Sequence, residues 1–237
     1  MGAGAVGRWV AGLLERSVAF ADVDPAVAEA AADALGDRAR VVPLDTTEDF
    51  DLVVVAVPMR VATETIRDFG PRATGALVDL TGAMVEPLQA MEEAAPDVER
   101  ASLHPLFAPE HAPGRVAMSR DTDGPTIAGL RDRLEAAGNE IVEVDPEVHD
   151  EAMETIQGRA HAAIIAFGLA AEQVPEALAT PVYEDIAALR ERVTSGSPGV
   201  YADIQAAFDG ARDIERAAGR LADADRDDFE ALYDDAG

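Results

Sequence analysis

Short apolar runs alternate with amphipathic stretches along the first 145 residues, and turn-forming residues separate them. The clearest run covers residues 51–58, where every position between Asp51 and Pro58 is apolar. A run of this length without a polar interruption is typical of a strand buried on both faces of a parallel sheet. The alternation predicts an α/β fold with a doubly wound, mostly parallel sheet and right-handed crossovers. Further strands are expected at 17–21, 40–42, 76–80, 100–103, 115–119 and 140–144, and helices at 8–16, 25–35, 61–69, 86–94 and 126–137.

The pattern changes at Pro146. From there to Gly237 no stretch alternates like a strand, and alanine-rich helical periodicity dominates between proline and glycine breaks. The sequence therefore predicts a sheet domain over residues 1–145 and an all-helical domain over residues 146–237. Because ligand sites often lie between domains, we expect the active site in a cleft between the two.

A glycine-rich turn stands at the amino-terminal end, with the spacing Gly2-x-Gly4-x-x-Gly7. Between a strand and a helix, such glycines allow a tight turn, close approach of the backbone to a pyrophosphate, and close helix packing. About 20 residues further on, the carboxylate of Asp22 can accept hydrogen bonds from both ribose hydroxyls and would repel a 2′-phosphate. The spacing predicts a Rossmann-like dinucleotide site that favours NAD over NADP. The expected cofactor contacts are Gly2, Gly4, Ala5, Val6, Gly7, Asp22, Val57 and Pro58.

One part of this pattern is missing, because only Met1 precedes Gly2 and the motif requires a strand there. We expect that strand upstream of residue 1. Two alternatives remain open. In one, the sheet has a gap at this position and cofactor binding is impaired. In the other, the glycines form a disordered tail and Asp22 caps the next helix.

Composition and charge narrow the partners and the cellular setting. The chain has 46 acidic and 19 basic residues, a formal net charge of −27, and all of the basic residues are arginine. This charge repels nucleic acid and anionic lipid, and there is no membrane-length apolar run or signal peptide, so we expect a cytoplasmic protein without nucleic-acid or membrane partners. Cysteine is absent, which excludes disulfides and thiolate chemistry. The composition resembles that of proteins from salt-loving archaea and predicts a halophilic protein.

Four stretches carry recognisable motifs. They are Val78-Asp-Leu-Thr-Gly-Ala-Met-Val-Glu-Pro-Leu-Gln-Ala-Met91, His104-Pro-Leu-Phe-Ala-Pro-Glu110, His149-Asp-Glu-Ala-Met-Glu-Thr-Ile-Gln-Gly-Arg-Ala-His161, and Thr180-Pro-Val-Tyr183 with Tyr201-Ala-Asp-Ile204. Together and in this order they resemble the prephenate dehydrogenase family. The resemblance implies NAD-dependent oxidative decarboxylation of prephenate to 4-hydroxyphenylpyruvate in tyrosine biosynthesis, by a homodimer joined through the helical domain.

Three alternatives to this function stay open. Arogenate is the alternative substrate for the same reaction. The second alternative is another oxidoreductase that combines a sheet domain with a helical dimer domain. The third is a non-catalytic protein that binds NAD or an aromatic ligand.

The resemblance makes His104 the catalytic base. As hydride leaves the ring carbon of prephenate, a neutral imidazole can accept the proton of the hydroxyl on that carbon. His104 ends a predicted strand, at the side of an α/β sheet where ligands bind. The alternative is a histidine that packs against Pro105 and has only a structural role.

The other histidines receive different roles. The resemblance makes His161 a substrate contact. His149 precedes it by twelve positions, which in an α-helix over residues 147–170 puts the two on different faces, so we expect His149 and Asp150 to mark the helix start structurally. We assign no role to His111, and four histidines so dispersed predict no metal site.

The chain departs from the family pattern at two positions. Gly82 stands where the family has a serine, so Thr81 could supply the hydroxyl for the substrate only by a shift of one residue. Glu184 stands where the family has an arginine that clamps a substrate carboxylate. A dianionic substrate still needs a cationic partner, for which a bidentate arginine is suited. The candidates are Arg190 first, then Arg159, and also Arg192; the alternative for all three is pairing with nearby acids.

Overall fold

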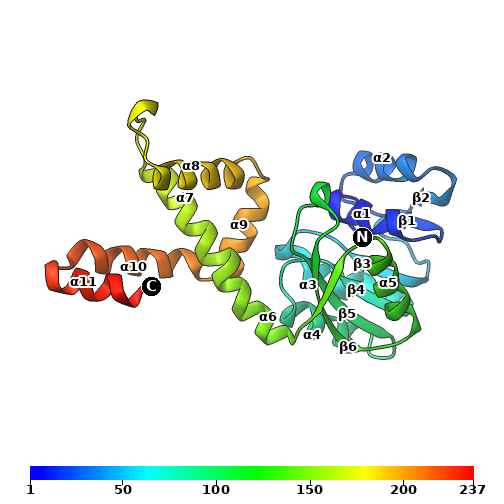
Figure 1. Ribbon diagram of the computed structural model, residues 1–237. Coiled ribbons are helices and arrows are strands. Elements are labelled where there is room, and N and C mark those ends of the chain that lie inside the picture. Colours follow the sequence, from blue (N-terminus) through cyan, green and yellow to red (C-terminus); the bar gives the residue numbers. More distant parts are fainter. The chain divides into compact units, whose positions relative to one another are not determined.

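The computed structural model describes residues 1–237 and divides into two compact units, Met1–Asp150 and Glu151–Gly237 (Figure 1). The division lies inside helix α6 (Pro146–Met153), which begins where the helical domain is expected to begin. All strands belong to the first unit, and the second unit is helical. No helix is long and apolar enough to cross a membrane.

The strands of the first unit form two sheets. In the smaller sheet, β1 (Val18–Phe20) and β2 (Ala39–Val41) pair in parallel. In the larger sheet, β3 to β5 are parallel, β6 is antiparallel to β5, and β7 runs parallel to β6. The predicted α/β class with a mostly parallel sheet is confirmed, although the strands are divided between two sheets instead of forming one. The order in the larger sheet is β3 (Phe50–Val55), β4 (Ala73–Asp79), β5 (Glu99–Pro105), β6 (Arg115–Thr122) and β7 (Glu140–Glu143).

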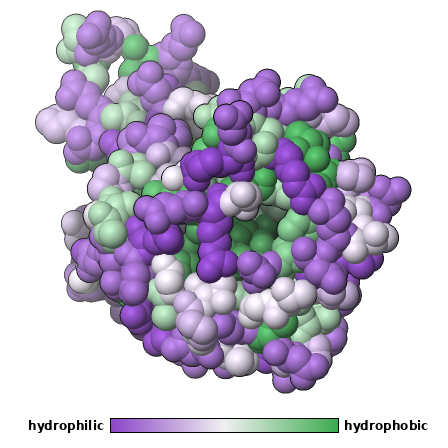
Figure 2. Space-filling view, turned by 90° about the vertical axis from the view of Figure 1, so that its right-hand side faces the viewer, coloured by the Kyte–Doolittle hydropathy of each residue, from purple (hydrophilic) through white to green (hydrophobic).

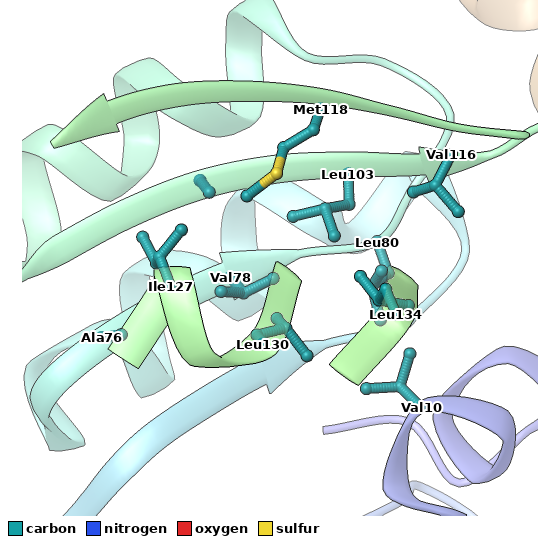
Figure 3. Packing of buried hydrophobic residues seen from close by; sticks show 11 residues of the cluster. Val10, Ala76, Val78, Leu80, Leu103, Val116, Met118, Ile127, Leu130 and Leu134 are labelled. Carbon is teal, nitrogen blue, oxygen red and sulfur yellow. The ribbon is translucent and has the colours of Figure 1, made fainter. Parts of the chain in front are cut away.

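Apolar side chains pack on both faces of the larger sheet. Successive residues of a strand point to opposite faces, so Leu77 and Val78 of β4 enter different layers. Val78 packs with Val10 of α1 and Leu130 of α5 (Figure 3), whereas Leu77 packs with Ile66 of α3. The core is therefore two apolar layers with the sheet between them. The helices of this unit are α1 (Ala5–Leu13), α2 (Pro25–Leu35), α3 (Ala62–Phe69), α4 (Val85–Ala94) and α5 (Pro125–Ala136).

Two helix starts show how local sequence decides the element. α2 has the predicted bounds, because the Asp24 side chain accepts a hydrogen bond from the N–H of Ala26 and Pro25 occupies the first helical position. α1 begins at Ala5 and not at residue 8, because Gly4 is the N-cap and the helix starts inside the glycine-rich turn.

The carboxyl ends of the parallel strands meet at one edge of the larger sheet. Val57 and Pro58 follow β3, Thr81 follows β4, and His104 is the penultimate residue of β5. Ligands of α/β proteins bind outside this edge. The sheet topology thus places predicted cofactor contacts, a predicted substrate contact and the predicted base at the same edge of the sheet.

The second unit contains a break that the sequence did not predict. The α-helix expected over residues 147–170 changes to a π-helix at Glu154–Arg159, so that expectation was wrong for its middle part. A Cβ added at Gly210 would lie 2.1 Å from the carbonyl carbon of Gly158, and Gln205 Nε2 donates to the Gly158 carbonyl oxygen at 2.9 Å. This tight crossing and the external donor accommodate the wider turn. The remaining helices are α7 (Ala160–Ala170), α8 (Pro181–Thr194), α9 (Pro198–Ala207), α10 (Gly210–Asp223) and α11 (Arg226–Asp235).

The π-helix also removes the basis for comparing the faces of His149 and His161. That comparison assumed a regular α-helix between them, with a constant rotation per residue. Because a π turn takes more residues than an α turn, the calculated separation does not apply.

Candidate functional site

The glycine-rich turn packs against the ends of both sheets. Gly2 has a φ of +81°, a region that favours glycine, and a Cβ added there would lie 2.2 Å from the carbonyl oxygen of Ala56. A Cβ at Gly7 would lie 2.1 Å from the carbonyl oxygen of Gly2. The N–H of Gly2 donates to the Ala21 carbonyl at 2.9 Å. These contacts overturn the alternative in which the glycines form a disordered tail.

Gly4 differs from the other two glycines of the motif, because a Cβ added there would meet no atom within 4 Å. As the N-cap of α1 it offers no side-chain acceptor, and the first turn of the helix contains no acidic residue. The backbone N–H groups of Ala5 and Val6 lie in this first turn, at the positive end of the helix dipole. Open space in front of an uncapped helix start fits an anionic phosphate.

Asp22 lies beside this turn, just after β1. Its Oδ2 accepts a hydrogen bond from the N–H of Ala3 at 2.8 Å, and its Oδ1 accepts one from the N–H of Asp24 at 3.0 Å. Each carboxylate oxygen has a further lone pair, so the group can still accept hydrogen bonds from two ribose hydroxyls. Val57 is also close, with its Cγ1 3.2 Å from a Cβ added at Gly2. Asp22 and Val57 therefore lie at the same turn as the glycines, and these residues fit a dinucleotide.

A hydrogen-bonded chain joins His104, His149 and Asp150. Nδ1 of His104 lies 3.0 Å from Nε2 of His149, and Nδ1 of His149 lies 2.8 Å from Oδ1 of Asp150. The Asp150 carboxylate also accepts hydrogen bonds from the N–H groups of Met84 and Val85 at the start of α4, at 2.9 and 3.0 Å. His104 and His149 are buried, with 8% and 2% of their surfaces exposed. The interpretation of His149 as only a helix-start element missed this contact.

The hydrogen-bond acceptors in the series His104–His149–Asp150 determine which ring nitrogen of each histidine carries the proton. An ionised carboxylate only accepts, so Nδ1 of His149 donates to Asp150. When both rings are neutral, Nε2 of His149 accepts the proton of Nδ1 of His104. The lone pair of the His104 ring is then on Nε2, the nitrogen that can accept a proton from a substrate.

Burial and neighbouring charges set the protonation states. The pKa of His104 is lowered to about 3, mainly by burial and also by the charge on the His149 ring, while Asp150 opposes the shift. Burial raises the pKa of Asp150, but hydrogen bonds from His149 and from the N–H groups of Val85 and Met84 outweigh this and hold it below its usual value. At neutral pH His104 is a neutral base and Asp150 an anion.

Gly82 lies next to the outer nitrogen of His104. A Cβ added at Gly82 would lie 3.8 Å from Nε2 of His104 and 3.0 Å from the sulfur of Met59. Position 82 therefore lies beside the predicted base, and the Met59 side chain takes up the space that a side chain at this position would need. Thr81, the predicted substitute for the family hydroxyl, donates its hydroxyl proton to Oδ2 of Asp79 at 3.1 Å.

Asp79 is a neighbour of the site that the sequence reasoning missed. It is fully buried at the end of β4, and its Oδ2 also accepts the hydroxyl of Ser102 at 2.9 Å. Burial raises its pKa to about 7, although the hydrogen bonds from Ser102 and Thr81 oppose the shift. The sequence contains one indication of this residue: an acidic side chain directly follows the apolar residues 76–78 of a predicted strand.

The second unit holds the other predicted substrate contacts. Nδ1 of His161 is buried without a hydrogen-bond partner, and its ring packs edge-on against Tyr201 with centroids 5.0 Å apart. Arg159 is already neutralised, because its Nε donates to Oδ2 of Asp213 at 2.6 Å and its Nη2 to Oε1 of Glu154 at 3.0 Å.

Arg190 differs from Arg159 in its ion pairing. It forms no ion pair and lines a cavity of about 290 Å³ together with Glu172 and Tyr183. Arg192 and Glu184 are exposed.

Comparisons with known proteins extend this picture. Residues 12–121 match the family described as "Prephenate dehydrogenase, nucleotide-binding domain". The chain is 36% identical over 240 residues to the 4-amino-4-deoxyprephenate dehydrogenase of Streptomyces pristinaespiralis, which covers 92% of this chain and 79% of that protein. It is 27% identical over 178 residues to a probable arogenate/prephenate dehydrogenase of Methanocaldococcus jannaschii, covering 68% of this chain and 40% of that protein.

A solved structure is similar over almost the whole chain. It is the prephenate dehydrogenase of Aquifex aeolicus in complex with hydroxyphenyl propionate and NAD+, with a TM-score of 0.69, 18% identity, and coverage of 98% of this chain and 93% of that one. This similarity confirms the fold class, and the match to the Streptomyces protein establishes the family. The resemblance found in the sequence is thus confirmed: the chain belongs to the prephenate dehydrogenase family of oxidoreductases.

Proposed function

We propose that this protein uses NAD to oxidise and decarboxylate prephenate, giving 4-hydroxyphenylpyruvate, CO2 and NADH. The observation that carries the proposal is the chain of hydrogen bonds His104–His149–Asp150, which leaves the lone pair of His104 on Nε2. The same unit contains the glycine-rich turn and Asp22. A relative named for arogenate and prephenate, and a solved relative that holds NAD+, support the substrate class and the cofactor.

The reaction requires a base of modest strength. Bound NAD would accept hydride from the ring carbon that carries the hydroxyl. As that hydride leaves, positive charge develops on the hydroxyl and its proton becomes acidic, so a base of low pKa is sufficient. Nε2 of His104 takes this proton as the carbonyl forms. The bond to the ring carboxylate then breaks, its electron pair enters the ring, CO2 leaves, and the oxygen regains a proton as the phenol forms.

His149 and Asp150 act as positioning residues in this mechanism. They hold the His104 ring in one orientation and keep its proton on Nδ1, as a buried aspartate does in a serine-protease triad. When Nε2 becomes protonated, the anionic Asp150 stabilises the resulting positive charge through the intervening ring. This support opposes in part the burial that lowers the pKa of His104.

We propose distinct binding roles for the remaining predicted residues. Phosphate would lie at Gly4 and the first turn of α1, and ribose at Asp22. Of the arginines, we favour Arg190 for a substrate carboxylate, because Arg159 is already paired with two carboxylates. We propose His161 as a second substrate contact, since the buried Nδ1 of its ring lacks a partner.

We also propose a homodimer that forms through the second unit. Large apolar side chains of its helices and connections are exposed, among them Leu169 at 85%, Leu178 at 74% and Val182 at 70%. Apolar surface of this kind marks protein interfaces. A monomeric mass by light scattering in concentrated salt would contradict this arrangement. A cytoplasmic location fits the proposed use of NAD, and cell fractionation tests it.

An assay of NADH absorbance and CO2 release tests the proposed function. Prephenate, arogenate and 4-amino-4-deoxyprephenate are compared, each with NAD and with NADP. We expect the highest kcat/KM for prephenate with NAD. Preference for arogenate would select the alternative substrate. Calorimetric binding of NAD without turnover of any substrate would support the non-catalytic alternative.

A further inference from the structure

Asp79 is a buried carboxyl group that the proposed mechanism does not use. Hydrophilic side chains cover much of the face of the first unit seen in Figure 2, whereas Asp79 is 0% exposed at the end of β4. Its neighbour on β5, Ser102, is also 0% exposed. Because burial disfavours the charged form of a carboxyl group, such a group needs either a cation beside it or a proton of its own.

The hydrogen-bond partners of Asp79 are all uncharged. Its Oδ2 lies 2.9 Å from the hydroxyl oxygen of Ser102 and 3.1 Å from that of Thr81. Its Oδ1 accepts a hydrogen bond from the N–H of Thr81 at 3.2 Å. On the other side, the residue paired with Asp79 on β3 is Val55, which is apolar. None of these groups can neutralise a carboxylate.

The titratable groups on the neighbouring segments do not supply a cation either. Those of β3 and β5 that lie at the opposite ends of the strands are Asp51, Glu99 and Arg100. Closer along the chain are His104, two positions beyond Ser102, and Asp150, which binds the start of α4. His104 is neutral and Asp150 is an anion. The surroundings of Asp79 therefore favour the neutral acid, and burial raises its pKa to about 7.

Ser102 has one hydroxyl proton and two acceptors within reach. Its Oγ lies 2.9 Å from Oδ2 of Asp79 and 3.5 Å from the carbonyl oxygen of Ala83. If Asp79 is ionised, the Ser102 proton goes to the carboxylate. If Asp79 carries a proton, it can donate to Ser102, and Ser102 is then free to donate to Ala83. No helical hydrogen bond replaces this donor, because the residue four positions after Ala83 is Pro87, which has no N–H.

Ala83 belongs to the loop between β4 and α4, residues 80–84, which lies beside the predicted base. Asp79 binds the start of this loop through Thr81, and Asp150 binds the N–H groups where the loop meets α4. Between these two anchors is Gly82, where an added Cβ would lie 3.8 Å from Nε2 of His104. The position of the loop therefore determines the space beside the nitrogen that takes the proton.

We propose that Asp79 is a positioning residue that acts as a neutral acid: it donates its proton to Ser102, and Ser102 donates to the carbonyl of Ala83. The two side chains thereby hold the loop in the position that aligns the substrate with Nε2 of His104. This inference rests on the proposed role of His104 as the base. Loss of the proton from Asp79 turns the Ser102 hydroxyl back to the carboxylate and releases Ala83. Because proton transfer depends on alignment, release lowers kcat more than it raises KM.

Infrared difference spectra test the neutral acid without cofactor or substrate. At about pH 6 exposed carboxyl groups are ionised, so the difference between the parent and Asp79→Asn isolates the buried group. We expect the C=O band of a protonated carboxylic acid in the parent and its loss in Asp79→Asn. The band should decrease as the pH rises through about 7. Absence of this band at about pH 6 would overturn the proposal.

Hydrogen exchange tests the hold on the loop, also without turnover. Ser102→Ala removes the donor to Ala83, so the amides of residues 81–83 should exchange about tenfold faster than in the parent at the same pH. Ser119→Ala is the matched control, because Ser119 is buried directly opposite Ser102 on β6 and has no hydrogen bond to the loop. Equal exchange in the two serine variants would contradict the proposal.

The pH dependence of NADH formation separates positioning from a merely structural role. We expect the kcat of the parent to fall about tenfold as the pH rises above about 7, with a smaller change in KM. Asp79→Asn should rescue the rate at high pH, because its NH2 group donates to Ser102 at every pH. Ser102→Ala should lower kcat about tenfold throughout, and Ser119→Ala should match the parent.

Equal pH profiles for the parent and Asp79→Asn above pH 7, or a Ser102→Ala variant with the parental kcat, would overturn the positioning role. Either result would leave the proposed dehydrogenase activity standing, since the parent would still form NADH. Absence of NADH formation by the parent would instead refute the proposed function. The infrared band and the exchange rates would still decide whether neutral Asp79 and Ser102 hold the loop.

Discussion

Nδ1 of His104 and Nε2 of His149 lie 3.0 Å apart, although 45 positions separate the two residues in the sequence. Asp150, the next residue along the chain, holds the far nitrogen of His149 and also the start of α4. One carboxylate therefore connects the helix that follows β4 with the histidine at the end of β5. This connection determines which nitrogen of His104 can act as a base.

Replacing Asp150 by Asn tests the role of this carboxylate in positioning. An amide whose NH2 group takes the place of Oδ1 can donate to His149 and reverse both tautomers, and its oxygen still accepts the N–H of Val85 but the N–H of Met84 loses its acceptor. We expect kcat to fall about 100-fold or more with a small change in KM, and the thermal midpoint to fall because of the lost hydrogen bond at Met84. Asp145→Asn is the matched control, since Asp145 only caps the start of α6 and its change should leave kcat unaltered. Equal kcat for the two variants would argue against positioning.

The low pKa of His104 predicts an unusual pH profile. A ring with a pKa of about 3 stays neutral through the physiological range, so kcat/KM should show no loss of activity near pH 6.5 that comes from this histidine. Steady-state rates from pH 5 to 9 in the Asp79→Asn variant check this, because that variant removes a buried carboxyl next to the site that titrates near neutrality. An acid limb near pH 6.5 in this variant would contradict the assigned protonation state.

The raised pKa of Asp79 predicts how the stability of the protein changes with pH. Its pKa is raised from 3.8 to about 7 in the folded chain, so between these values the folded state holds a proton that the unfolded state has lost. The free energy of unfolding then falls as pH rises through this window, by up to about 4 kcal/mol from this group. Asp79→Asn should remove that fall, so its stability relative to the parent should increase from pH 4 to pH 8.

Denaturant unfolding of the parent and of Asp79→Asn at several pH values measures this difference. His104 contributes a slope of opposite sign, since its pKa is lowered, but it is common to both proteins and cancels in the comparison. Asp51→Asn serves as the control because the Asp51 side chain is 81% exposed. A constant difference across this pH range would show that Asp79 does not titrate as described.

Gly4 offers a clean test of the cofactor turn. A methyl group at Gly4 meets no protein atom, but it would occupy the space in front of α1 where we place phosphate. Gly4→Ala should therefore keep the thermal midpoint and weaken NAD binding about tenfold or more by calorimetry. Gly12→Ala adds a methyl group that also meets no protein atom, further along α1. It should leave NAD affinity unchanged and raise the thermal midpoint slightly, because alanine favours the helix. Unchanged affinity in Gly4→Ala would place the phosphate elsewhere.

The net charge of −27 predicts dependence on salt. Repulsion between surface carboxylates opposes folding in dilute buffer, and concentrated salt screens it. We expect the thermal midpoint to rise by about 10 °C or more between about 0.1 M and about 3 M KCl. Equal midpoints at the two concentrations would refute the halophilic character expected from the composition.

Local patterns in the sequence were sufficient for most of the fold. The bounds of α2 follow from Asp24, Pro25 and Gly36, which act within a few residues of the helix ends. The apolar run at residues 52–57 identified the strand β3, but burial on both faces was wrong for it: Val53 and Val55 are buried, whereas Leu52 and Val54 are only partly buried because β3 lies at the edge of the larger sheet. The π-helix was beyond such reasoning, since it depends on the contact between Gly158 and Gly210 from different helices.

The candidate site was predictable where a motif marks it and hidden where only the fold creates it. His104 and Asp22 stand at recognisable positions after strands. The contact between His104 and His149 arises because α6 returns to the ends of β4 and β5, a tertiary relationship that spacing along the chain does not encode. The adjacent pair His149-Asp150 was the one available signal, because a carboxylate beside a histidine often fixes its tautomer.

The most direct test of the central claim compares NADH formation from prephenate by the parent protein and by His104→Asn. We expect the parent to form NADH and the variant to be slower by about 100-fold to 10,000-fold, while both bind NAD with equal affinity in calorimetry. Equal rates of NADH formation by the two proteins would contradict the role of His104 as the base.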